Sequence, residues 1–208
     1  ATWANLISIL DKETTEDLTA WSEVWVNTAG RPNFSLVQSP AELRIRQDDP
    51  SRQDRVWMQT FTMASKANGS WVAETVTSDG ENDISHTDNG LVMLNSDGFG
   101  YGLFPVPIEL FDHWETLDPV QRGSLLISTY ENMLEGKVID AADYVIELIK
   151  IIRKEDNQLL LDVAISQLDT IYWSFVADTE RNAIAKELES LLWDKILSSS
   201  EDSSKKIF

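Results

Sequence analysis

The chain has 208 residues, of which 42% are hydrophobic and eight are Trp, so a disordered protein is excluded because this much apolar surface repays the entropy of ordering. A formal net charge of −18 disfavours nucleic acid and anionic membranes as partners, since both are polyanions. Cysteine is absent, which excludes disulfides, thiolate zinc ligands and cysteine nucleophiles.

The hydropathy pattern indicates a soluble protein. No apolar run approaches the roughly 20 residues that a bilayer-spanning helix needs, and no signal-peptide pattern opens the chain. We therefore expect a soluble protein, and both a cytoplasmic and a periplasmic location stay open.

Two helices forming a hairpin are predicted first. The earlier one has apolar residues at i, i+3, i+4 and i+7, namely Trp3, Leu6, Ile7 and Leu10. It lacks a start signal, so we expect the natural polypeptide to begin upstream. The later one follows a capping pattern at residues 14–17, carries Leu18, Trp21, Val24 and Trp25 on one face, and ends at a Gly30-x-Pro32 turn.

The apolar period then changes to two, which predicts strands. Alternation begins near Phe34 and continues at residues 43–46 and 56–63, and Asn68-Gly69 predicts a hairpin turn into a strand at 71–77. Further short strands are expected at 83–86, 91–94 and 101–106. This number and spacing of strands favour an antiparallel β-sandwich over residues 33–108.

The rest of the chain is predicted to be helical. Asp118-Pro119 is an N-cap followed by proline at the first helical position. Helices are expected at 119–135, 141–154, 157–175 and 179–197, and the short loops between them indicate an antiparallel, solenoid-like array. Residues 198–208 are Ser-rich and charged, and we expect a disordered tail. The predicted fold class is therefore α+β, with several domains.

Apolar residues on these helices occupy more than one stripe. Residues 149, 151 and 152 are all Ile, and residues 191–193 are Leu, Leu and Trp. Helices of this kind pack on two sides. An array without a polar capping helix leaves an apolar side unburied, so a dimer through exposed helical ends is one candidate assembly.

Two sequence motifs carry a resemblance. Residues 17–26 have the form D-L-x-x-W-x-x-x-W-V and run into the G-x-P turn, and residues 95–101 have the form N-x-x-G-x-G-Y. In this order, with a helical array after them, they resemble the C-terminal region of the aminopeptidase N family of gluzincin zinc metallopeptidases. The resemblance spans most of the chain.

The resemblance implies a domain organisation and a role. Residues 1–32 would be the last helices of a peptidase domain, 33–108 a β-sandwich domain, and 109–197 the start of a C-terminal α-helical domain. The family removes N-terminal residues from peptides with a zinc ion held by an H-E-x-x-H helix and a downstream Glu, and a G-x-M-E-N loop holds the substrate amino group.

None of those catalytic motifs occurs in the chain. We therefore expect an inactive portion with structural and substrate-gating roles, with zinc only in the full-length parent. Its expected partners are the missing catalytic domain of the same protein and the parent's peptide substrates. Nucleic acid and membranes are not expected partners.

No residue is predicted to be catalytic, cofactor-binding or metal-ligating. His86 and His113 lie 27 residues apart and are predicted to be ordinary surface residues, because a zinc-binding helix needs two histidines one turn apart. Ser70 lacks the G-x-S-x-G context of a nucleophilic serine. Acidic pairs at 48–49 and at 81 and 83 lack calcium-loop spacing and are predicted to be solvated turn residues.

The remaining conspicuous residues are glycines and tryptophans. Glycines at 98, 100 and 102 are followed by neither a helix nor a lysine, so a tight strand connection is predicted in place of a phosphate loop. Six tryptophans are predicted to point into cores or domain interfaces, with carbohydrate stacking as an alternative: Trp21, Trp25, Trp57, Trp71, Trp173 and Trp193.

Two other functions stay open. One is a self-contained binding module, in which the sandwich recognises a carbohydrate or peptide and the helices form a scaffold. The other is a carboxylate-based hydrolase, which needs a cleft with two acidic residues of separated pKa values.

Overall fold

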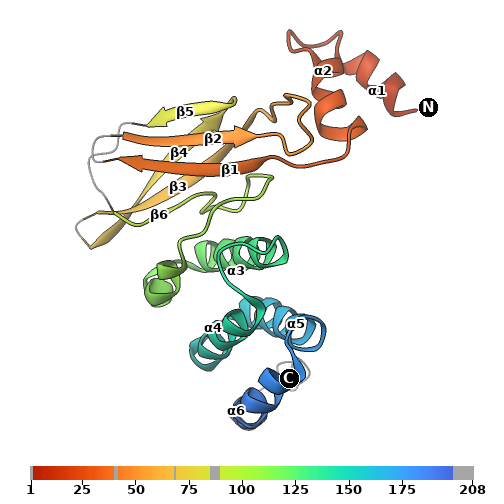
Figure 1. Ribbon diagram of the computed structural model, residues 1–208. Helices are drawn as coiled ribbons and strands as arrows, with labels where there is room; N and C mark the ends of the chain where they lie inside the picture. The colour runs from red at the N-terminus through yellow and green to blue at the C-terminus, as the bar shows by residue number, and fades with distance from the viewer. Residues whose placement is uncertain (1, 40–41, 68, 85–89, 199–208) are drawn as a thin grey trace. The chain divides into compact units, whose positions relative to one another are not determined.

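The computed structural model describes residues 2–39, 42–67, 69–84 and 90–198. Short helices come first, then two small antiparallel sheets and then four helices, so the predicted α+β class is confirmed (Figure 1). The chain divides into two compact units. The first comprises Ala1–Thr60, Thr75–Asn89 and Gly100–Phe104, and the second comprises Phe61–Glu74, Gly90–Phe99 and Pro105–Phe208.

The predicted N-terminal hairpin is present. It consists of α1 (Trp3–Leu10), α2 (Leu18–Ser22) and a π-helical continuation, η1 (Glu23–Asn27). The N-cap of α2 is Asp17, whose carboxylate accepts from the amide of Ala20 at 2.8 Å. The capping pattern predicted to start at Thr14 is therefore wrong by three residues, because an aspartate stands directly before the first helical residue.

The first sheet contains β1 (Asn33–Ser39), β2 (Glu42–Asp48) and β5 (Glu81–Ile84), in the order β1-β2-β5. Both pairings are antiparallel, and the Cα partner of Leu36 is Ile45. Leu43 and Ile45 are fully buried, and the arginines beside them are not. The period of two predicted for residues 43–46 is therefore confirmed.

The second sheet contains β3 (Gln59–Ala67), β4 (Ser70–Ser78) and β6 (Val92–Met93), in the order β4-β3-β6. β3 and β6 are antiparallel, with Ala64 opposite Met93. Gly69 has φ +83°, a value that suits glycine, at the predicted hairpin turn. Phe61 and Met63 are buried, as predicted.

Two of the predicted strands are shortened or missing. The strand expected at 91–94 has only two residues, and residues 101–106 form no strand. Leu103 makes a single parallel bridge to Asn33, and its carbonyl accepts from the amide of Phe34 at 2.8 Å. Pro105 and Pro107 have no N–H group to continue a ladder, which explains why pairing stops there.

The helical part begins with a 3₁₀ segment, η2 (Ile108–Thr116), which was not predicted. The four predicted helices follow as α3 (Pro119–Leu134), α4 (Ala141–Lys154), α5 (Gln158–Ser174) and α6 (Asp178–Ser198), within one or two residues of the expected bounds. α5 packs against α3 and α4, and α6 packs against α4.

Local capping explains these bounds. Asp118 and Gln121 form a complete capping box at the start of α3. Gly136 has φ +66° just beyond its end, as expected for a C-terminal glycine. Asp140 accepts from the amide of Asp143 at 2.9 Å and caps α4.

The core of the second unit gathers around α4, which has six buried residues. Ile149, Ile151 and Ile152 are all buried, so the prediction that this helix packs on two sides is confirmed. On α6 only Leu191 is buried, whereas Trp193 is 63% exposed. Along the described residues no helix is both long and apolar enough to cross a bilayer.

Candidate functional site

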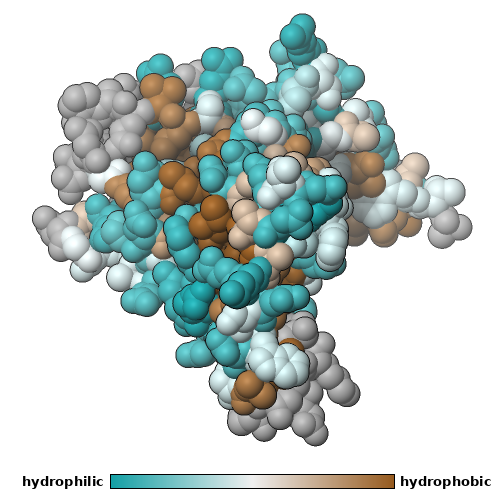
Figure 2. Space-filling model, turned by 60° about the horizontal axis from the view of Figure 1, so that its bottom comes forward, coloured by the Kyte–Doolittle hydropathy of each residue, from teal (hydrophilic) through white to brown (hydrophobic). Residues whose placement is uncertain are grey.

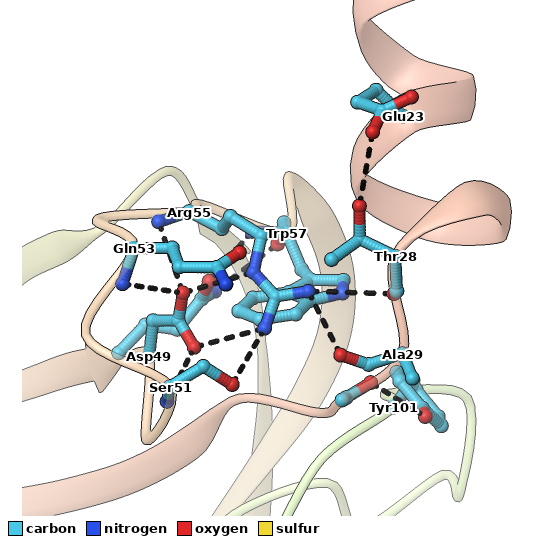
Figure 3. Close-up of polar contacts among 11 residues, drawn as sticks. Glu23, Thr28, Ala29, Asp49, Ser51, Gln53, Arg55, Trp57 and Tyr101 are labelled. Carbon is cyan, nitrogen blue, oxygen red and sulfur yellow. Dashed lines mark hydrogen bonds and ion pairs between the residues drawn. The ribbon is translucent and has the colours of Figure 1, made fainter.

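A highly connected polar site in the first unit is an ion pair between Asp49 and Arg55. Arg55 donates from Nε to Oδ2 at 2.9 Å and from Nη2 to Oδ1 at 3.0 Å, which is a bidentate arrangement (Figure 3). The side chains of Arg55 and Asp49 are only 9% and 2% exposed. The pair is therefore well shielded from water, and we call it the Arg55 anchor.

The Arg55 anchor also holds the end of the N-terminal hairpin. Nη1 donates to the carbonyls of Thr28 at 3.3 Å and Ala29 at 3.1 Å, and the guanidinium lies 4.5 Å from the ring centroid of Trp57 (Figure 3). A Cβ at Gly30 would lie 2.7 Å from Nη2, and this residue has φ +134°. Glycine is therefore needed where the chain leaves the hairpin.

The pKa values of the two charged groups indicate that the Arg55 anchor positions the chain. The hydrogen bond from Arg55 holds the pKa of Asp49 well below its usual range, although burial opposes this shift. The same interaction raises the pKa of Arg55. A carboxylate with so low a pKa is a poor proton acceptor, and the amide of Ser51 also donates to it. Asp49 is thus a structural group and not a general base.

Aromatic residues lie beside the end of the hairpin. The rings of Trp21 and Trp25 are 6.5 Å apart, those of Trp25 and Tyr101 are 5.9 Å apart, and the Tyr101 hydroxyl donates to the Gly30 carbonyl at 3.1 Å. We call Trp21, Trp25 and Tyr101 the aromatic row. A groove of about 410 Å³ adjoins it, lined by both tryptophans together with Val56 and Met58.

The hairpin also exposes much of its apolar surface. On α1 only Ile7 is buried, whereas Trp3, Leu6 and Leu10, the other members of its predicted apolar face, are each more than 40% exposed. Trp3 donates from Nε1 to the buried Ser22 hydroxyl at 2.7 Å, so the hairpin is ordered by its own contacts. We call Trp3, Leu6 and Leu10 the hairpin face.

Only one of the two histidines lies among the described residues. His113 lies on η2, where Nδ1 is 3.0 Å from Lys66 Nζ and the ring meets Trp71 edge-on at 6.2 Å. His86 lies outside the described residues. Among the residues that the structure describes, no group of three or more His, Asp or Glu side chains is arranged to hold a metal ion.

The two aspartates at 48–49 differ in burial. Asp48 makes an exposed ion pair with Arg46 at 3.0 Å, as a solvated residue would, whereas Asp49 is buried in the Arg55 anchor. The prediction of a solvated turn is therefore wrong for Asp49, because Arg55 compensates the loss of water around it. The side chains of residues 81 and 83 lie outside the described set.

The serine and glycine predictions concern turns. Ser70 is exposed at the first position of β4. Gly98 has φ +72°, and Gly102 has φ +150° with its Cβ position 2.9 Å from the carbonyl oxygen of Pro32. Close backbone approach therefore requires glycine at 102, in agreement with a tight connection.

Three of the six tryptophans predicted to point into cores or domain interfaces lie in no core of the described residues. Trp57 is buried, and Trp25 and Trp71 are half-buried, but Trp21, Trp173 and Trp193 are exposed. Apolar periodicity identifies the face of a helix, and it does not identify what covers that face. An exposed aromatic surface is therefore a feature of both units.

A buried polar cluster on the helices was missed by the sequence analysis. The carboxylate of Glu155, only 2% exposed, accepts from Trp114 Nε1 at 3.0 Å and Arg122 Nη1 at 2.8 Å. Lys195 of α6 donates to the Glu155 carbonyl at 2.9 Å. These residues lie 33 to 41 positions apart, and no spacing rule connects them. Their contacts stabilise the helical array.

Comparison with protein-family models gives no matching family, and comparison with the curated proteins gives no matching relative.

Proposed function

We propose that the chain is a non-catalytic C-terminal portion of a zinc-dependent aminopeptidase of the aminopeptidase N family. In this proposal residues 1–32 close the peptidase domain, residues 33–108 are a β-sandwich, and residues 109–197 begin a solenoid-like helical domain. The sandwich spaces the helical domain from the catalytic domain, and the helices restrict the access of long or folded peptides to the zinc site.

The hairpin face is the observation that carries the proposal. Trp3, Leu6 and Leu10 have the spacing of a buried helix face, yet each is more than 40% exposed in this chain. Exposed apolar surface of this kind is typical of an interface. A catalytic domain that continues the peptidase fold would cover it.

The Arg55 anchor supports the same proposal. It binds the two carbonyls directly before the Gly30-x-Pro32 turn, which is the point where the proposed peptidase helices pass into the strands. A buried bidentate pair fixes orientation better than a single hydrogen bond. In the proposed enzyme, Arg55 would therefore hold the last peptidase helix at a fixed angle to β1.

The residues of this chain that the structure describes do not fit a zinc site. The His113 ring faces the Lys66 ammonium, and a neighbouring cation disfavours a metal ion. Zinc would be held by the parent's catalytic domain. This chain would contribute support and access control, and no step of the hydrolysis.

The test compares the 208-residue chain with the natural polypeptide that contains it. Zinc is measured by mass spectrometry, and turnover is measured on a panel of aminoacyl fluorogenic substrates. We expect neither zinc nor turnover in the chain, and one zinc with chelator-sensitive turnover in the natural polypeptide. A natural polypeptide without aminopeptidase activity, or stoichiometric zinc in the chain alone, would refute the proposal.

Variants of the natural polypeptide sharpen this test. Trp3→Ser with Leu10→Ser should lower turnover and thermal stability, since each fully buried large apolar side chain contributes about 1.5–3 kcal/mol. Phe99→Ser is the matched control, because Phe99 is 85% exposed and lies outside the hairpin. Equal effects of the two changes would remove the support that the hairpin face gives.

A self-contained binding module is the second candidate, and the aromatic row favours it. Trp21, Trp25 and Tyr101 present adjacent, partly exposed rings of the kind that stack on sugars or on peptide side chains. Glycan and peptide arrays test this function. Saturable binding that Trp21→Ala abolishes and Trp193→Ala leaves intact would establish it over the aminopeptidase proposal.

The carboxylate-hydrolase alternative has less support. Burial raises the pKa of Asp97, but hydrogen bonds from Thr62 and from the amide of Phe99 outweigh burial and leave that pKa below its ordinary value. The pKa of Asp49 is also lowered. Neither group is therefore the protonated acid that such a hydrolase needs.

A further inference from the structure

The second unit contains an apolar groove between α5 and α6. Its cavity volume is about 560 Å³, and its floor is formed by Ile165, Leu168 and Tyr172 of α5 and by Leu188 and Leu192 of α6. Trp173, 66% exposed, stands at the edge. Figure 2 turns the side that carries the C-terminal helices toward the viewer, and hydrophobic residues lie exposed there among hydrophilic ones.

The two walls of this α5–α6 groove have the same spacing. On α5 the lining residues include positions 165, 168, 169 and 172, and on α6 they include 185, 188, 189 and 192. Both sets follow i, i+3, i+4 and i+7, so each helix presents one continuous stripe along the groove. Two such stripes match the apolar face of a third helix, as in helix-in-groove recognition.

Each stripe has an acidic residue at the same place. Asp169 occupies the i+4 position on α5, and Glu189 occupies it on α6; both are exposed, and both line the groove. None of the described residues that line the groove is Lys, Arg or His. The groove is therefore apolar at its floor and negatively charged at its rim.

A cation beside the groove is already engaged. Arg181, at the start of α6, pairs with Asp178 and donates from Nη1 to the carbonyls of Trp173 at 3.3 Å and Val176 at 2.9 Å. Its guanidinium also lies 5.6 Å from the Trp173 ring centroid. These contacts hold the end of α5 to the start of α6, so one end of the groove is preformed.

We propose that the α5–α6 groove is the docking site of a basic amphipathic helix supplied by a partner protein. The apolar stripe of that helix would lie on the groove floor, and Lys or Arg residues flanking the stripe would pair with Asp169 and Glu189. Complementary charge at a rim selects partners and accelerates encounter, while the buried apolar side chains supply most of the affinity. This inference uses only α5 and α6 and does not depend on the proposed aminopeptidase origin.

The probes are two synthetic 18-residue helical peptides with the same leucine stripe, one flanked by Lys and Arg and the other by Glu. Binding of the fluorescently labelled peptides to the 208-residue chain is followed by anisotropy at low and high salt. We expect saturable binding of the basic peptide, weakened by salt because the rim pairs are exposed, and no measurable binding of the acidic one.

Variants place the binding in the groove. Asp169→Lys with Glu189→Lys should weaken the basic peptide about tenfold and allow the acidic peptide to bind. Asp162→Lys with Asp194→Lys is the matched control, because these exposed acids lie on the same two helices but do not line the groove. Trp173→Ser should also weaken binding about tenfold, with Trp193→Ser as its control. Circular dichroism establishes that each variant is folded.

Three results would overturn the proposal. The first is equal binding of the basic and acidic peptides, and the second is equal loss in the groove variants and their controls. The third is self-association in sedimentation equilibrium that Trp173→Ser abolishes, because a second copy of the chain would then occupy the groove.

Discussion

Helices α4 and α6 belong to the same unit, and both carry apolar residues on more than one side, yet their surroundings differ. On α4 both sides are covered, and Leu148, Ile149, Ile151 and Ile152 are all buried. On α6 one side packs against α4 through Leu191, and the other leaves Leu197 exposed. A double apolar stripe therefore indicates that a helix is suited to two neighbours, and the neighbours need not both be in the same chain.

The largest expected effect comes from shortening one leucine side chain in each helix. Leu148→Ala should destabilise the protein by about 3 kcal/mol, because Leu148 is fully buried and its loss leaves a cavity. Leu197→Ala should cost less than about 0.5 kcal/mol, since that side chain is exposed. Denaturant unfolding measures both changes. Equal costs would mean that the outer side of α6 is covered in solution.

A charge pair at each helix gives the next contrast. Glu155→Gln should cost about 2 kcal/mol, because the partly buried Arg122 loses the anion that compensates its charge. Glu187→Gln, on α6, should cost less than about 0.5 kcal/mol, since its pair with Arg153 is exposed on both sides. Chemical denaturation checks both values. A neutral Glu155→Gln would show that the buried cluster adds no stability.

Alkaline pH should act on α4 through Tyr144. Burial raises the pKa of Tyr144 well above its ordinary value of about 10, so the neutral form is favoured in the folded state. The stabilisation that this pKa difference gives the folded state is complete below pH ~10. Above that value the free energy of unfolding falls by about 1.4 kcal/mol per pH unit. Unfolding of the wild type and Tyr144→Phe between pH 9 and 11.5 measures the difference. Identical pH profiles would contradict the assigned burial.

The smallest effect concerns the start of α4. Asp140→Ala removes the side-chain acceptor of the Asp143 amide and should cost about 1 kcal/mol. Asp140→Asn should be nearly neutral, because asparagine caps as well as aspartate. Thermal unfolding of both variants checks the prediction. If Asp140→Asn lost as much stability as Asp140→Ala, the effect would come from the charge of the aspartate and not from capping.

The helical part of the fold was the most predictable from sequence. Asp118-Pro119, Gly136 and Asp140 act within one turn of the backbone, so local chemistry decides where these helices begin and end. The segment 101–106 was not predictable in the same way. Its residues alternate like a strand, but the pairing of Leu103 depends on Asn33, which lies far earlier in the chain.

The candidate sites were less predictable for the same reason. No spacing rule joins Asp49 to Thr28 through Arg55, or Trp114 to Glu155, because the contacts depend on tertiary structure. The exposure of Trp173 was missed because helical periodicity does not report a neighbour's absence. The acidic positions of the α5–α6 groove are visible in the sequence only once the two helices are known to face each other.

The interleaving of the two units bears on synthesis and on dissection of the protein. The chain passes between them at 60/61, 74/75, 89/90, 99/100 and 104/105. During translation the first unit stays incomplete until residue 104 has left the ribosome, because Leu103 bonds to the start of β1. No single cut yields both units whole, so a truncation series should lose the first unit abruptly when residues 100–104 are removed.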